Sequence, residues 1–160
     1  MDEFWRELSA GMPSVAAGAV EAVKVLCAAL VGGALGYERQ LTGKEAGLRT
    51  HMLVCLGSCV FVMAVLSHDT SLDGVSRVVQ GIATGIGFVG AGAILKLVEQ
   101  RNIKGLTTAA NIWFTAALGV AVGLGRFWLA LAGTAVAWFI LSTLEQLEKK
   151  LNLEHPPRTD

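Results

Sequence analysis

Polar residues that could do chemistry interrupt the long apolar stretches of this sequence at two places. At the first, "GYERQ" contains Glu38 and Arg39, and Arg49 follows in "AGLRT". Because neighbouring residues on a helix point about 100° apart, we expect Glu38 to pair with Arg49 rather than with Arg39. The three residues could also form a charged rim that sets the depth of a helix in a membrane, or Glu38 could bind an ion.

The second place is the segment "KGLTTAANIWFTA". Thr107 and Thr108 precede Asn111 by four and three residues. Thr115 follows by four, so one face of a helix would be polar. Threonine hydroxyls can bond back to the backbone of their own helix. The amide of Asn111 needs a partner on another helix, such as Gln80, or a bound ion or water. Both interpretations of Asn111 stay open.

A third pattern is glycine-rich. In "GIGFVGAGAIL", Gly85, Gly87 and Gly90 fit the G-x-G-x-x-G spacing of dinucleotide-binding loops. That motif needs a strand before it and an acidic residue about 20 residues later. Here the preceding "VVQGIAT" continues the same apolar stretch, and Ala110 and Asn111 stand where the acid should be. We therefore predict no nucleotide site. No nucleophile and base stand at a readable spacing either, so we do not expect an enzyme.

The elements that must position these residues are apolar. Hydrophobic residues make up 53% of the 160 residues and charged residues 16%, against about 25% in soluble domains. Five stretches are long enough, or nearly so, to cross a bilayer as helices of roughly 17 to 25 residues. They span 15–36, 52–66 (47–66 when extended backward), 78–97, 106–123 and 127–144. Soluble helices would show a polar face, which these stretches lack. We predict an all-α, polytopic membrane bundle of five transmembrane helices.

The glycines have a role in such a bundle, because helices in lipid pack closely through small residues. Three of the stretches contain a GxxxG pair, and the 78–97 stretch has further glycines on more than one side. We expect a tight bundle with this stretch at its centre; an alternative is local unwinding near an ion path. The packing glycines are Gly32, Gly36, Gly81, Gly85, Gly87, Gly90, Gly92, Gly119 and Gly123.

Basic residues predict the orientation. Nine of the Lys and Arg residues lie in segments on one side of the five spans, and three lie on the other. The nine are Arg39, Lys44, Arg49, Lys96, Arg101, Lys104, Lys149, Lys150 and Arg158, and the three are Arg6, Arg77 and Arg126. The positive-inside rule then places the N-terminus outside and the C-terminus in the cytoplasm. The zero net charge does not favour nucleic acid as a partner.

We divide the chain into three parts. Residues 1–13 form an N-terminal interfacial segment, 14–145 the five-helix domain and 146–160 a short cytoplasmic tail. The acidic start "MDEFWREL" is unlike a secretory signal. Glu21 and Lys24 lie three residues apart and could pair, or Lys24 could extend toward the membrane surface. The three cysteines lie in apolar runs and are expected to be small buried side chains.

Taken together, "GYERQ…AGLRTHMLV", "GIGFVGAGAIL" and "IKGLTTAANIWFTAALGVAVG" resemble the transmembrane domain of the MgtC/SapB family over roughly residues 20–145. The resemblance implies a bacterial inner-membrane protein with about five spanning helices, linked to growth at low magnesium. Some members of that family restrain the proton-driven ATP synthase. The family's motif residues fall here on Glu38, Arg39, Gly47, Arg49, Gly85, Gly87, Gly90, Gly92, Gly105, Thr107, Thr108, Ala109 and Trp113.

Two functions follow as expectations. The first is a small regulator that binds another membrane complex; the second is an oligomeric transporter or channel for magnesium or protons. Magnesium prefers several oxygen ligands in octahedral geometry, and Glu38 with Asn111 and the threonines offers few per chain. Five helices also cannot divide into two equal inverted halves. The expected partners are the bilayer, further copies of the chain (a dimer is favoured) and another membrane complex. We expect no cofactor, with Mg²⁺ the one candidate ligand.

Overall fold

The computed structural model describes residues 1, 14–67, 71–95 and 105–144, and every regular element in these ranges is a helix. The helices are α2 (Val15–Leu41), α3 (Leu48–Leu66), α4 (Leu72–Leu95), α5 (Leu106–Gly123) and α6 (Phe127–Phe139), which continues into a π-helical turn, η2 (Ile140–Leu144). Within these ranges, five helices are long and apolar enough to cross a membrane. The all-α class and the presence of five helices long and apolar enough to cross a membrane are therefore confirmed.

Some predictions fall on other parts of the chain. The interfacial segment at 1–13 (apart from Met1), the basic loop at 96–104 and the tail at 146–160 lie outside the described residues. The domain boundaries at either end, and the orientation of the termini in the membrane, stay predictions.

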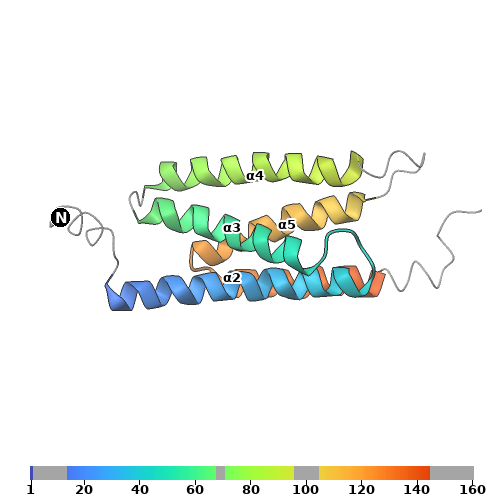
Figure 1. The fold of residues 1–160 in the computed structure, drawn as a ribbon, viewed down its shortest axis with the longest axis horizontal. Helices are drawn as coiled ribbons and strands as arrows, with labels where there is room; N and C mark the ends of the chain where they lie inside the picture. The colour runs from blue at the N-terminus through green and yellow to red at the C-terminus, as the bar shows by residue number, and fades with distance from the viewer. Residues whose placement is uncertain (2–13, 68–70, 96–104, 145–160) are drawn as a thin grey trace, which may run out of the picture.

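The helices lie side by side along one axis, and the chain reverses direction from each helix to the next (Figure 1). Three reversals contain a glycine in the left-handed region, which other residues rarely adopt. Gly43 between α2 and α3 has φ +68°, Gly105 before α5 has φ +90°, and Gly125 between α5 and α6 has φ +74°. As a result α2 ends, α3 begins, α4 ends and α5 begins at the same end of the bundle, which we call the polar end because of the side chains described below.

The central helix is α5. In its span 56% of the residues are buried, against 6% in the span of α4. The prediction that the 78–97 stretch forms the centre is therefore wrong. The reason is that α5 is rich in small residues, such as Ala116, Gly119 and Ala121, on the faces that meet α2 and α3. GxxxG pairs occur in α2, α4 and α5 alike, so the motif alone does not identify the helix with the most neighbours.

Close approach of helices is achieved at four glycines. On α5, a Cβ added at Gly119 would collide with the carbonyl oxygen of Cys55 on α3, and one at Gly123 would lie 2.9 Å from that of Cys59. On α2, a Cβ at Gly32 would lie 2.8 Å from Cys55 Cβ, and one at Gly36 would lie 2.7 Å from the Cα of Leu48. Real Cβ atoms do not approach other atoms this closely, so α3 can pack against α2 and α5 only because these residues lack side chains.

The glycines of α4 are placed differently. The four at positions 81, 85, 87 and 92 face open space, and a Cβ at Gly90 would make an ordinary contact of 3.6 Å with Ala109 on α5. The helix is regular from Leu72 to Leu95, so the alternative of local unwinding is wrong. The predicted packing of these four glycines against neighbouring helices of the bundle is therefore not found among the described residues.

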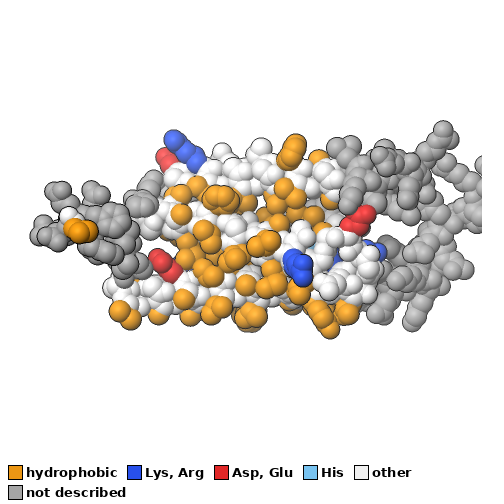
Figure 2. All heavy atoms as spheres, in the orientation of Figure 1, with side chains coloured by type: hydrophobic (Ala, Val, Ile, Leu, Met, Phe, Trp, Pro, Cys, Tyr) orange, Lys and Arg blue, Asp and Glu red, His pale blue; other side chains and the backbone are white. Residues whose placement is uncertain are grey.

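Many large apolar side chains are exposed on the outside of the bundle, and Figure 2 shows those of one face in orange. Leu30 is 72% exposed, Phe88 85% and Trp128 82%. A soluble monomer rarely exposes apolar patches on this scale, whereas lipid solvates them at no cost. Cys55 and Cys59 are fully buried, and both are free thiols, as expected of small core residues.

Candidate functional site: a buried polar cluster between three helices

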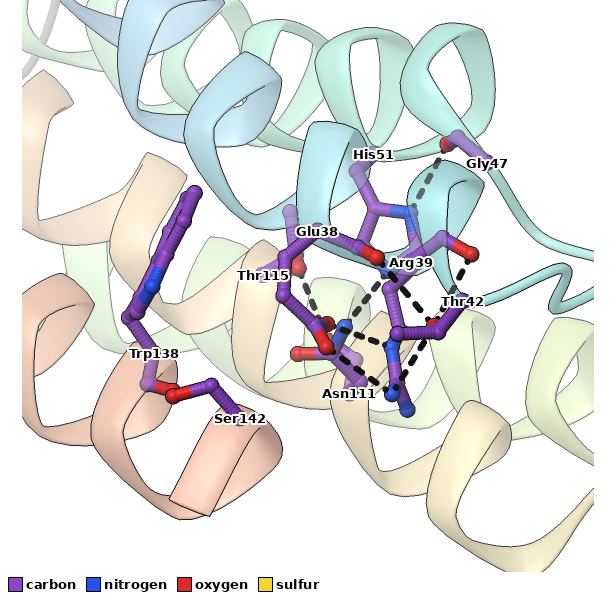
Figure 3. A network of polar contacts seen from close by, with 9 residues as sticks. All are labelled: Glu38, Arg39, Thr42, Gly47, His51, Asn111, Thr115, Trp138 and Ser142. Carbon is purple, nitrogen blue, oxygen red and sulfur yellow. Dashed lines mark hydrogen bonds and ion pairs between the residues drawn. The ribbon is translucent and has the colours of Figure 1, made fainter. Parts of the chain in front are cut away.

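The last turn of α2 carries a buried ion pair. Glu38 is 4% exposed and Arg39 1%. Arg39 Nε donates to Glu38 Oε2 at 2.7 Å, and Nη2 donates to Oε1 at 3.3 Å (Figure 3). The predicted pairing of Glu38 with Arg49 is wrong. Arg49 is exposed, because it stands two residues from the inward-facing His51 and so points away from the bundle. Both partners in the pair have long flexible side chains, which overcome the angle between neighbouring positions.

Thr42 joins this ion pair to the end of α2. Its Oγ1 accepts a bond from Arg39 Nη2 at 3.4 Å. The hydroxyl also lies 3.1 Å from the carbonyl oxygen of Glu38 and 3.2 Å from that of Arg39, and can donate its proton to either. Thr42 caps the helix, and its backbone N–H donates to the carbonyl of Glu38. A guanidinium in the last turn also interacts favourably with the negative end of the helix dipole.

A second buried pair links α3 to α5. His51 is fully buried and Asn111 is 5% exposed. His51 Nδ1 lies 2.9 Å from the carbonyl oxygen of Gly47, and Nε2 lies 2.9 Å from Asn111 Nδ2. The expectation that Asn111 needs a partner on another helix is met by His51, not by Gln80. Gln80 is exposed on α4 and donates to Ser76 within its own helix.

Sequence reasoning missed His51. The signal was present, because His51 is the one histidine inside the apolar stretches, one turn after Gly47. Its position depends on α2, since a Cβ at Gly36 would come within 3.0 Å of His51 Cβ. The glycine on α2 thus provides the space in which the imidazole ring reaches α5.

The polar face of α5 is formed in part as predicted. Thr115 is fully buried and donates to the carbonyl oxygen of Asn111 at 2.7 Å, the back-bonding expected of threonine. Thr108 is buried on the same face at 8% exposure. Thr107 is exposed and does not join the cluster. Figure 3 shows the ion pair on α2 close to the contact between His51 and Asn111.

The cluster is closed on itself. Both carboxylate oxygens of Glu38 accept bonds from Arg39, so the charges cancel. In the described part of the chain no buried side-chain nitrogen or oxygen lacks a partner. No group of three or more His, Cys, Asp and Glu that could hold a metal is found among those residues either. The arrangement therefore joins α3 to α5 through the contact between His51 and Asn111, with the Glu38–Arg39 pair beside it on α2, instead of presenting a set of oxygen ligands to a cation.

The opposite end of the bundle carries one further polar contact. Lys24 Nζ donates to the carbonyl oxygen of Gly123, the last residue of α5, at 2.8 Å. Glu21 and Lys24, which the structure describes, do not form an ion pair with each other. Lys24 instead binds a carbonyl at the negative end of α5, where a cation is stabilising.

A hollow of about 550 Å³ opens between α3 and α4. Its lining is almost entirely apolar and includes three glycines, Gly57 on α3 and Gly81 and Gly85 on α4. All three face open space. The two helices therefore stand apart along the middle of the bundle.

The chain is similar to known proteins. Residues 25–150 match the MgtC family. The chain is 44% identical over 137 residues to the Escherichia coli K12 protein named "Putative magnesium transporter YhiD", covering 81% of this chain and 62% of that protein. It is 41% identical over 137 residues to SrpB of Synechococcus elongatus, covering 79% and 75%. It is 41% identical over 130 residues to MgtC of Salmonella typhimurium, covering 81% and 54%.

These relatives are longer than the region that matches. The alignments cover between 54% and 75% of their lengths, so each has sequence with no counterpart here. No solved structure matches the chain.

Proposed function

The chain belongs to the MgtC family, and from that premise we propose that it is a bacterial inner-membrane protein that serves magnesium homeostasis by regulating another membrane complex. The link to magnesium is supported by the names of the relatives. The bilayer is supported by five apolar spans and the exposed apolar surface. The distribution of Lys and Arg supports an outside N-terminus and a cytoplasmic polar end.

The observation that favours a regulator over a carrier is the state of Glu38. It is the one carboxylate in the buried cluster, and both of its oxygens are engaged by Arg39. Mg²⁺ needs six oxygen ligands and is attracted by net negative charge, whereas this cluster is neutral. A carrier would have to break the ion pair before the carboxylate could bind an ion.

The surface that such a regulator would use is the open side of α4. The helix has few buried residues, and its glycines at 81 and 85 face the hollow beside α3. Helices in lipid associate through such small-residue faces. We expect a transmembrane helix of the partner complex to pack there; a second copy of this chain is the alternative occupant.

Two measurements test the proposal. Purified protein in liposomes should move neither magnesium nor protons faster than empty vesicles do. Flux that is present in the wild type and lost in folded Glu38→Gln protein would support the carrier instead. The folded state of the variant is checked by size-exclusion chromatography.

The second measurement is photo-crosslinking in native membranes. A crosslinking amino acid replaces Phe88 on α4, and a control replaces Leu30 on α2; both side chains are exposed. Capture of a larger membrane protein from position 88 alone supports the regulator. Adducts with only a second copy of the chain would count against it.

A further inference from the structure

The hydrogen bonds of His51 specify its protonation. A carbonyl oxygen can only accept, so the contact with Gly47 requires a proton on Nδ1. Nε2 is then an acceptor and receives a bond from the amide nitrogen of Asn111. The buried ring is therefore neutral and in the Nδ1–H tautomer. This state suits both of its contacts at once.

A second proton on the ring is incompatible with this geometry. If Nε2 gains a proton, two donors face each other across 2.9 Å. The amide of Asn111 must then rotate to present its oxygen, or α5 must move away from α3. The bond from Nδ1 to Gly47 is unaffected, so the change is confined to the contact between the two helices.

We propose that His51 and Asn111 form a proton-sensitive latch, in which the neutral ring holds α5 against α3 and uptake of a proton at Nε2 releases it. The ligand is a proton, and the step is its transfer from solvent to the Nε2 lone pair, which leaves a singly charged imidazolium.

The surroundings of the ring support the latch. The charged groups that face it are Glu38 and Arg39 on α2, which neutralise each other. On its own helix, Arg49 is exposed, and α5 presents only uncharged side chains. The charged side chains of α4 that the structure describes lie at the opposite end of the bundle, and so does Arg126 at the start of α6. Among the residues that the structure describes, an imidazolium would therefore find no carboxylate beside the ring that is free to pair with it, so proton uptake and helix movement must occur together.

The latch acts on α5, the central helix of the bundle. α4 rests on the first turns of α5, where Gly90 meets Ala109. Movement of this part of α5 would therefore shift α4, which presents the open surface. The regulatory consequence rests on the proposed function, but the latch itself can be tested without a partner.

The first test is ¹⁵N NMR of the histidine rings of the full chain in lipid nanodiscs, with His51→Gln used to identify the His51 signals. At neutral pH the wild type should show the neutral Nδ1–H tautomer. In Asn111→Asp, the new carboxylate can accept from Nε2–H, so His51 should be doubly protonated at the same pH. A neutral Nε2–H tautomer in the wild type would overturn the proposal.

The second test is the melting temperature of the purified protein from about pH 8 to about pH 5, which brackets the titration of an ordinary histidine. Loss of one buried hydrogen bond should lower the wild-type value by on the order of 5 °C over this range. His51→Gln should lack this drop. An equal drop in both proteins would overturn the latch. The flux and crosslinking results do not depend on it, so the two proposals can fail separately.

Discussion

Gly119 on α5 lies so close to the carbonyl oxygen of Cys55 on α3 that no side-chain carbon fits between the two helices. One turn further along, Gly123 repeats the relationship with Cys59. The two contacts bring the backbones of α3 and α5 together, and α2 packs closely against α3 at Gly32 and Gly36. The same GxxxG spacing on α4 lies in open space, so it makes no such contact within the chain.

Gly119→Ala should therefore destabilise the protein, whereas Gly81→Ala should not. The first change places a Cβ inside the contact with Cys55, and overpacking costs about 1–3 kcal/mol. The second adds a Cβ in open space and replaces glycine in a helix, which is worth up to about 1 kcal/mol in the opposite direction. Thermal unfolding in detergent measures both. Equal effects would contradict the packing described here.

The buried ion pair gives the next prediction. Arg39→Gln leaves the carboxylate of Glu38 buried without its partner, which should cost about 3–5 kcal/mol. The double change Glu38→Gln with Arg39→Gln removes both charges and should cost less than the sum of the two single changes. Arg49→Gln is the matched control, since it removes an exposed arginine at the same end and should change stability by no more than about 0.5 kcal/mol. Additive single effects in denaturant unfolding would show that the two side chains do not act as a pair.

Much of the fold was predictable from sequence because span length and apolarity are local properties. The spans Leu106–Gly123 and Phe127–Leu144 end where the apolar stretches end. The helix of α2 continues past the predicted end at residue 36 to Leu41, because Glu38, Arg39 and Gln40 favour the helix although they are not apolar. The length of an apolar stretch thus underestimates the length of a helix whose last turn carries charged residues.

The candidate site was predictable only in part, for a different reason. The need of Asn111 for a partner is a property of the side chain and could be read from the sequence. The identity of that partner depends on how α3 is rotated about its axis, and this rotation is set by contacts at Gly32 and Gly36 on another helix. For the same reason the sequence favoured Arg49 as the partner of Glu38, although α3 is rotated so that Arg49 points outward.

Orientation in the membrane can be tested with single cysteines at the two ends. Lys44→Cys lies in the loop at the polar end, and Arg126→Cys lies between α5 and α6 at the other end. Because basic residues favour the cytoplasmic side, a membrane-impermeant maleimide should label Arg126→Cys in cells whose outer membrane has been opened. Lys44→Cys should react only after the inner membrane is permeabilised. Of the three native thiols, Cys55 and Cys59 are fully buried and Cys27 is partly buried within the span of α2, and the background that they contribute is measured directly in the wild type. The reverse pattern of labelling would invert the topology and place the polar cluster outside.

Lys24 binds the carbonyl of Gly123, whereas the sequence suggested that it could pair with Glu21. Substitutions at positions 24 and 21 distinguish these two contacts. The ammonium of Lys24 donates to the carbonyl oxygen of Gly123 at 2.8 Å and so satisfies a free carbonyl at the end of α5. Lys24→Met keeps most of the apolar stem but removes the donor, and should lower the free energy of unfolding by about 1–2 kcal/mol. Glu21→Gln changes an exposed side chain with no ion pair to Lys24 and should have almost no effect. If Lys24 instead acted through Glu21, the two substitutions would weaken the protein to the same extent in thermal unfolding. A loss confined to Lys24→Met would show that the lysine acts on the end of the central helix, on the side of the bundle away from the polar cluster.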